Sequence, residues 1–230
     1  MKKIFIIFCV LVLSCAAFGQ QIKKQNVELN DVVTLLGLAG YELFSYDITE
    51  MLNERYDMVF VRKEFDAGKE IANLNLSTIP NKRLLTDLPE SYWQQMIDAG
   101  QIIDSKTQAI AHAEKITIGF HPHNNDSTKF IRISVPGFVT GMGVSLKMRG
   151  LPVKDSAQKV YRYHVLPFKI GTFKEGEFIP LILFGSSWYD EQYNAYRFCG
   201  EREIDPDMSS EILKDVPHHY VFGVRFVKKQ

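Results

Sequence analysis

Cysteine is scarce in this sequence, with only three in 230 residues, and two of them, Cys9 and Cys15, lie close to the N-terminus. A chain that loses its N-terminal segment keeps Cys199 alone, so an intramolecular disulfide is excluded and the folded state must depend on its hydrophobic core. A chain of about 210 residues can build such a core, because it buries roughly 70% of the surface that it exposes when unfolded.

Neither sign of charge is in excess, since 27 lysine and arginine residues balance 27 aspartate and glutamate residues. Loss of the lysines at positions 2 and 3 changes the formal charge only to −2, and no block of like charges occurs. Binding to a polyanion depends on clustered basic residues. The composition therefore argues against nucleic acid or an anionic membrane surface as the partner.

Long apolar segments and motifs for nucleophilic catalysis are missing too. The apolar run from Ile4 to Leu13 is shorter than the roughly 20 residues that span a bilayer, and no later segment is long and apolar enough, so we expect no transmembrane helix. No G-x-S-x-G motif occurs, and the glycine-rich stretch from Gly137 to Gly150 lacks the spacing of a phosphate-binding loop. The sequence predicts no catalytic residues.

The N-terminal stretch, MKKIFIIFCVLVLSCAAFGQQ, has the layout of a secretory signal peptide: two lysines, an apolar run and then small residues. Cleavage after Gly19 places small residues where the peptidase requires them and predicts a mature chain of residues 20–230. In the alternative, "VLSC" (Val12 to Cys15) is a lipobox and Cys15 is acylated. Both alternatives predict export from a Gram-negative cytoplasm, to the periplasm, the outer envelope or the medium, with a lipid anchor only in the second.

The hydrophobic pattern predicts a mainly β (α+β) fold, an antiparallel β-sandwich-like domain with a few peripheral helices. A short helix is expected to begin near Asn30 and stop at Gly40, and strands with a hairpin around Gly68 follow it. A helical excursion is expected at about 79–113, where an apolar stripe from Leu88 to Ile97 predicts core packing. We favour one domain over residues 20–230; the alternative is two packed subdomains, 20–110 and 111–230.

From residue 115 onward the pattern is nearly all strand, broken by a short helix expected near "SSEILKDV". In the last apolar stretch Tyr220, Phe222, Val224 and Phe226 alternate with other residues, so they share one face of a strand. This predicts a half-buried closing strand.

The leader, taken with "GYELFSYDIT" and "YDMVFVRKEF", resembles the small secreted proteins of unknown function of Bacteroides-type gut bacteria. The resemblance covers about a quarter of the chain. It implies a Gram-negative envelope or secreted setting, and it carries no functional residue over to this sequence.

An aromatic stretch, "WYDEQYNAYRF", provides flat rings beside amide and carboxylate groups, a combination that sugar-binding proteins expose. The candidate ligand-binding residues are Trp188, Tyr189, Tyr193, Asn194 and Tyr196, and the expected partner is a glycan or an envelope protein. The other interpretation, which we favour, is a hairpin whose rings fill the core, with Trp188 the most exposed of them.

The stretch "GFHPHNND" places His121 and His123 two residues apart, on one face of an extended chain. We favour the end of a strand and a hairpin turn, because asparagine and aspartate suit tight turns. The alternative is a metal-dependent hydrolase with zinc on His121 and His123. Zinc needs a further ligand, and the sequence offers five: His112, Glu114, His164, His218 and His219.

Taken together, these features favour an exported or envelope-associated β-rich module with a non-catalytic role in binding or structure. The zinc hydrolase is the second hypothesis. A third metal ligand that converges on the histidine pair is the feature that distinguishes the two.

Overall fold

The computed structural model describes residues 28–122, 127–152, 158–198, 202–210 and 212–229. The predicted signal peptide, the lipobox cysteine Cys15, His123 and Cys199 lie outside these residues. The chain divides into two units, Met1–Leu38 and Ala39–Gln230.

The described part of the first unit is helix α2 (Leu29–Leu38). It confirms the helix expected from Asn30, and the chain leaves it through Gly40, whose φ of 83° is in the region that favours glycine. In the described ranges, no helix is long and apolar enough to cross a membrane.

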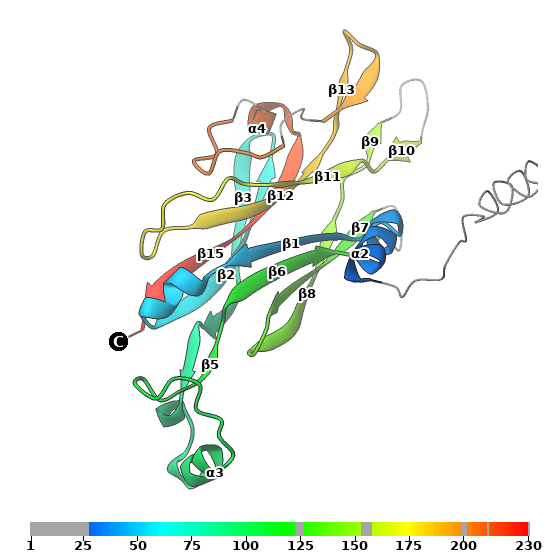
Figure 1. Cartoon of the computed structure of the whole chain (residues 1–230). Helices are drawn as coiled ribbons and strands as arrows, with labels where there is room; N and C mark the ends of the chain where they lie inside the picture. The colour runs from blue at the N-terminus through cyan, green and yellow to red at the C-terminus, as the bar shows by residue number, and fades with distance from the viewer. Residues whose placement is uncertain (1–27, 123–126, 153–157, 199–201, 211, 230) are drawn as a thin grey trace, which may run out of the picture. The chain divides into compact units, whose positions relative to one another are not determined.

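The second unit is built on two antiparallel sheets (Figure 1). The larger has the strand order β11-β12-β15-β2-β3, so its central strand, β15, comes from the C-terminus. Ala67 and Gly68 join β2 to β3 with φ angles of 48° and 74°, which confirms the hairpin expected around Gly68. The bounds of these strands are β2 (Tyr56–Asp66), β3 (Lys69–Pro80), β11 (Tyr163–Pro167), β12 (Ile179–Ser186) and β15 (His218–Lys228).

The smaller sheet has the order β1-β6-β7-β8, and its strands are β1 (Glu42–Asp47), β6 (Lys115–Phe120), β7 (Thr128–Val135) and β8 (Val139–Lys147). Strands β6 and β7 pair antiparallel, with a register that runs from Thr117↔Ser134 to Phe120↔Ile131. The main chain of His121 still donates to Phe130 O at 2.9 Å. This pairing confirms that the histidine stretch connects the two strands of a hairpin, although residues 123–126 lie outside the described ranges.

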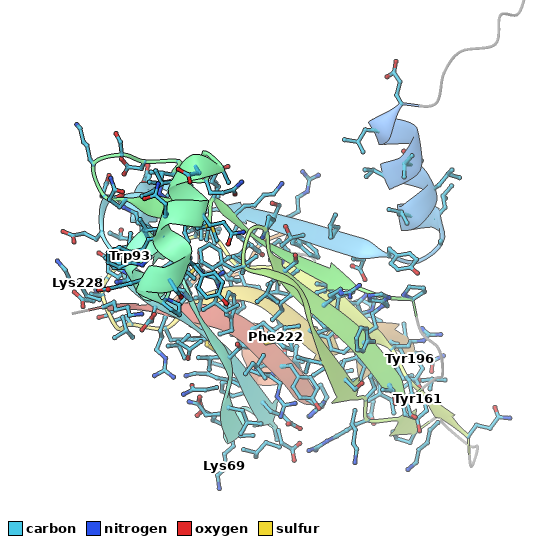
Figure 2. The ribbon with its side chains drawn as sticks, turned by 90° about the horizontal axis from the view of Figure 1, so that it is seen from below. Lys69, Trp93, Tyr161, Tyr196, Phe222 and Lys228 are labelled. Carbon is cyan, nitrogen blue, oxygen red and sulfur yellow. The ribbon has the colours of Figure 1, made fainter. Side chains whose placement is uncertain are left out.

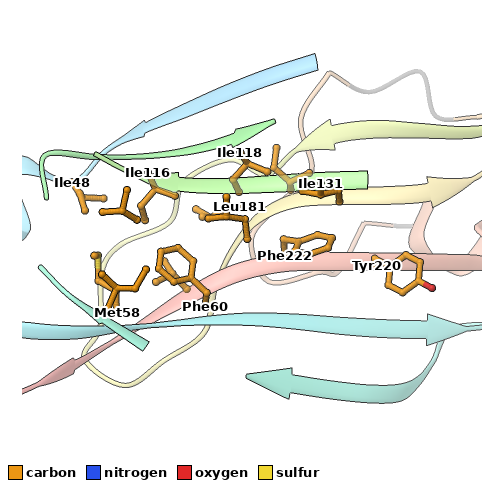
Figure 3. Packing of buried hydrophobic residues seen from close by; sticks show 14 of the residues in the cluster. Ile48, Met58, Phe60, Ile116, Ile118, Ile131, Leu181, Tyr220 and Phe222 are labelled. Atoms are coloured by element: carbon orange, nitrogen blue, oxygen red, sulfur yellow. The ribbon is translucent and has the colours of Figure 1, made fainter. Parts of the chain in front are cut away.

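The core lies between the two sheets, as Figure 3 shows. Ile116, Ile118 and Ile131 come from the smaller sheet and pack in one buried cluster with Phe60 and Phe222 of the larger one. Complete burial of a large apolar side chain stabilises a fold by roughly 1.5–3 kcal/mol. The predicted β-sandwich-like architecture is therefore correct.

The closing strand β15 is buried on both faces, whereas the sequence predicted a half-buried strand. Phe222 and its neighbours of the same parity face the sandwich core, as expected. Val221, on the opposite face, lies in a second cluster with Leu183, Ile204 and Leu213. The segment that carries Ile204 and the short helix α4 (Ile212–Asp215) supplies this cover, and α4 confirms the helix expected there.

The segment after β3 contains β4 (Lys82–Leu84), the 3₁₀ turns η2 (Leu85–Asp87) and η3 (Glu90–Tyr92), helix α3 (Trp93–Asp98) and β5 (Ala109–His112). The expected helix is present, but the prediction that its apolar stripe packs in the core is wrong: Tyr92 is 52% exposed and Ile97 46%. The helix packs mainly against the preceding 3₁₀ turns, so neither sheet covers its apolar side.

Candidate functional site

The aromatic stretch forms a small hairpin of β13 (Trp188–Asp190) and β14 (Ala195–Arg197). Asp190 stabilises its turn, because Oδ1 accepts hydrogen bonds from the main chain of Gln192 (3.0 Å) and Tyr193 (3.3 Å). Asn194 has a φ of 49° and accepts a hydrogen bond from the Tyr189 hydroxyl. The hairpin expected in this stretch is thus present, and Asn194 serves its turn.

The prediction that these rings fill the core is wrong. Trp188, Tyr189 and Tyr196 are half-buried, and Tyr193, not Trp188, is the most exposed ring, at 62%. The physical reason is position: β13 begins after the chain leaves the five-stranded sheet at the end of β12, and the hairpin projects past that sheet (Figure 1). Among the described residues no opposing sheet covers the hairpin.

A pocket of about 560 Å³ lies beside this hairpin. Its walls come from the residue that follows β12, from β14 and the residue after it, and from the chain that runs from the end of β10 (Lys159–Val160) into the first two residues of β11. Figure 2 shows Tyr161 and Tyr196 close together, at the end of the unit opposite Trp93. The volume is in the range of small-molecule sites. The lining residues are Tyr161, Arg162, Tyr163, His164, Ser187, Tyr196 and Phe198.

Two polar side chains of the wall are paired with each other. The His164 Nε2 atom lies 3.1 Å from the Ser187 hydroxyl oxygen, and the imidazole stacks on Phe198 with ring centroids 4.5 Å apart. Burial and the nearby Arg162 charge lower the pKa of His164, so the ring is neutral at neutral pH. The main-chain N–H of Ser187 donates to the Arg162 carbonyl (2.8 Å), and so it is not free to stabilise an oxyanion.

A buried chain of hydrogen bonds holds the wall residue Tyr163. Its hydroxyl oxygen accepts from the Arg149 main-chain N–H at 3.0 Å and lies 2.6 Å from His218 Nδ1. His218 Nε2 lies 3.2 Å from the Glu64 carboxylate. The one consistent assignment has the hydroxyl donating to Nδ1 and Nε2–H donating to Glu64.

The protonation of this chain follows from its burial. Burial lowers the pKa of His218 and raises the pKa of Tyr163 to about 12, so both groups are neutral at neutral pH. The network therefore fixes the position of the Tyr163 ring and does not supply a reactive phenolate.

The predicted zinc ligand His121 lies at the other sheet, between the rings of Tyr41 and Phe130, whose centroids are 5.3 and 5.0 Å away. Two of the additional donors proposed from the sequence, His164 and His218, have the partners described above, and His219 stacks on Phe65 at 4.7 Å. Within the described ranges, no three histidine, cysteine, aspartate or glutamate side chains form a metal-binding group. His123 lies outside those ranges, so the zinc hypothesis stays a prediction.

The sequence pointed to two of the seven pocket residues, Tyr196 as a ligand-binding residue and His164 as a possible zinc ligand, and it gave no indication of the other five. The signal that could have revealed several of them is "YRYH" at residues 161–164. In an extended strand its two tyrosine rings share one face, and the arginine and the histidine share the other. No sequence feature indicates that this segment meets Ser187 and the hairpin, because those contacts depend on how the strands are ordered in the sheet.

The chain matches a known family. A family model described as a domain of unknown function (DUF5041) matches residues 11–228. The match includes every described strand and all seven pocket residues. No curated protein and no solved structure matches the chain.

Proposed function

The chain belongs to the DUF5041 family of domains of unknown function, and from the geometry of its pocket we propose that it is an exported, non-catalytic module that binds a carbohydrate. The leader supports export, and the ring-lined pocket supports binding. The expected setting is the envelope or the surroundings of a Gram-negative cell.

The pocket beside the aromatic hairpin is the observation that carries this proposal. Sugars present an apolar ring face and a rim of hydroxyl groups, so a suitable site combines aromatic rings with a few fixed polar groups. Here Tyr161, Tyr196 and Phe198 supply rings, while His164 and Ser187 supply neutral hydrogen-bonding groups. The Tyr196 hydroxyl donates to the Pro152 carbonyl at 2.8 Å, which fixes that ring before a ligand arrives.

Binding fits this site better than hydrolysis does. Ser187 and His164 are within hydrogen-bonding distance, as a nucleophile and its base must be. However, no carboxylate among the described residues orients the imidazole, and the Ser187 N–H is already engaged. Within the described residues the pair therefore has no third group to orient the base, and the Ser187 N–H cannot act as the oxyanion donor that acyl transfer requires.

The proposal is tested by a glycan array followed by calorimetric titration of the best ligand. We expect Tyr161→Ala and Phe198→Ala each to weaken binding at least tenfold, which corresponds to about 1.4 kcal/mol. Tyr92→Ala is the matched control, because Tyr92 is an exposed ring on η3 and does not line the pocket. The variants must keep the wild-type melting temperature to within a few degrees.

Two outcomes contradict the proposal. One is the absence of binding to every glycan on the array by the correctly folded chain. The other is a glycan that binds equally well to the wild type and to both pocket variants, because the site would then lie elsewhere.

A further inference from the structure

Arg162 is the only formally charged residue in the described wall of the pocket, and no aspartate or glutamate accompanies it there. Its guanidinium carbon lies 4.8 Å from the centroid of the Tyr196 ring. This contact holds the cation against an aromatic face at the pocket, and a guanidinium so placed keeps its N–H groups available at its edge.

The arginines near this end of the sheet differ in their partners. Arg149 pairs with Asp66 at 2.5 Å, and Arg197 pairs with Asp190 at 2.7 Å. Among the residues that the structure describes, no carboxylate pairs with Arg162. A cation without a partner, at a pocket whose described wall has no acidic group, favours an anionic group on the ligand.

The other polar groups of the wall do not oppose this preference. His164 is neutral, and its Nε2 lies against the Ser187 hydroxyl, so these two residues offer hydrogen bonds without charge. At low pH a protonated His164 adds a second positive charge beside Arg162. The electrostatics of the pocket thus favour an anion at neutral pH and favour it more strongly in acid.

We propose that the ligand is an acidic sugar whose carboxylate is bound by Arg162 while its ring lies against the aromatic wall. The inference rests on the proposed function, since it specifies the chemical class of the carbohydrate. A guanidinium forms two parallel hydrogen bonds with a carboxylate, which a lysine or a hydroxyl group cannot do.

The test compares each acidic sugar with its own methyl ester, which differs by the loss of the charge. The probes are oligosaccharides of galacturonate, oligosaccharides of glucuronate and sialyllactose, titrated into the full mature chain by calorimetry. We expect at least one acid to bind tenfold or more tightly than its ester. We also expect that preference to shrink when the salt concentration rises from about 0.05 M to about 0.5 M, because salt screens exposed charges.

Variants assign the preference to one residue. Arg162→Gln should bind acid and ester equally, and Arg162→Lys should keep only part of the preference. Arg83→Gln is the matched control: Arg83 is also an exposed arginine over an aromatic ring, with its guanidinium carbon 5.5 Å from the Phe138 centroid, but it does not line the pocket.

The outcomes separate this inference from the proposed function. If neutral glycans or the methyl esters bind as tightly as the acids, or if Arg162→Gln keeps the preference, the inference is wrong and carbohydrate binding stands. A sulfated sugar that binds more tightly than the carboxylated probes also overturns it. If neither neutral nor acidic sugars bind, both the inference and the proposed function fail.

Discussion

Burial of the neutral His219 imidazole should make the fold less stable in mild acid. His219 is 1% exposed on the central strand β15, stacks on Phe65 and lies beside His218. Burial, reinforced by the neighbouring His218, lowers the pKa of His219 from 6.5 to about 4. Its Nδ1 atom is buried without a hydrogen-bond partner in the described residues, which further disfavours the charged ring.

The sign and size of the effect follow from proton linkage. Below pH 6.5 the unfolded chain takes up a proton on this ring while the folded chain does not, so stability falls as the pH falls toward 4. At pH 5 the unfolded ring is almost fully protonated and the folded ring is still neutral. The free energy of unfolding should therefore be about 2 kcal/mol lower at pH 5 than at pH 8 through this residue alone.

Urea unfolding of the mature chain at pH 8 and at pH 5 measures this difference. His219→Gln removes the titrating group, so its loss of stability between the two pH values should be about 2 kcal/mol smaller than that of the wild type. His121→Gln, on the other sheet, should lose as much as the wild type. The reasoning is refuted if His219→Gln loses as much stability in acid as the wild type, or if NMR titration of the folded chain finds this ring protonated at pH 6.

Four further predictions concern single features of the molecule. Asn81→Ala should lower the free energy of unfolding by about 3 kcal/mol, because the buried amide forms hydrogen bonds with three main-chain groups at 2.7–3.0 Å. Chemical denaturation measures this loss, with Asn73→Ala as the exposed control. Tyr163→Phe should lower the free energy of unfolding by about 1–2 kcal/mol and weaken ligand binding, since it leaves His218 Nδ1 without a hydrogen-bond donor. An unchanged melting temperature and an unchanged ligand affinity would contradict this prediction. Intact-mass measurement of protein expressed with its leader should find the first 14 or 19 residues missing, and an uncleaved membrane form contradicts both routes of export. Untagged protein should hold substoichiometric zinc by elemental analysis, whereas near-stoichiometric zinc that disappears in His121→Ala would favour the metal-dependent enzyme.

Several elements of the fold were predictable because their causes are local. The turn at Gly68 depends on two residues with positive φ, and helix α2 depends on an apolar pattern that ends at a glycine. Tyr220, Phe222 and Phe226 occupy alternate positions of β15, and this spacing determines that their side chains share one face. These features need no knowledge of which strands become neighbours.

The wrong predictions concern which side chains are buried, and they have a different cause. The stripe on α3 and the rings of the β13–β14 hairpin were expected in the core because apolar periodicity indicates which side chains are alike, and it does not indicate whether another layer covers them. The second face of β15 was expected in solvent for the same reason. Ile204, 17 residues earlier in the chain, is part of the cluster that buries Val221.

The sequence alone determined the fold class and the presence of a hairpin rich in aromatic residues, while the export leader and the absence of a disulfide after its removal stay predictions. The tertiary structure decided where those aromatic residues lie and which partners they meet. Strand β12 pairs with β11 on one side and β15 on the other, and this order brings Arg162 and His164 beside Ser187 and Tyr196. Strand order depends on the total free energy of burying both faces of the sheets, and residues far apart in the chain contribute to that free energy. A local sequence pattern therefore cannot predict the pocket.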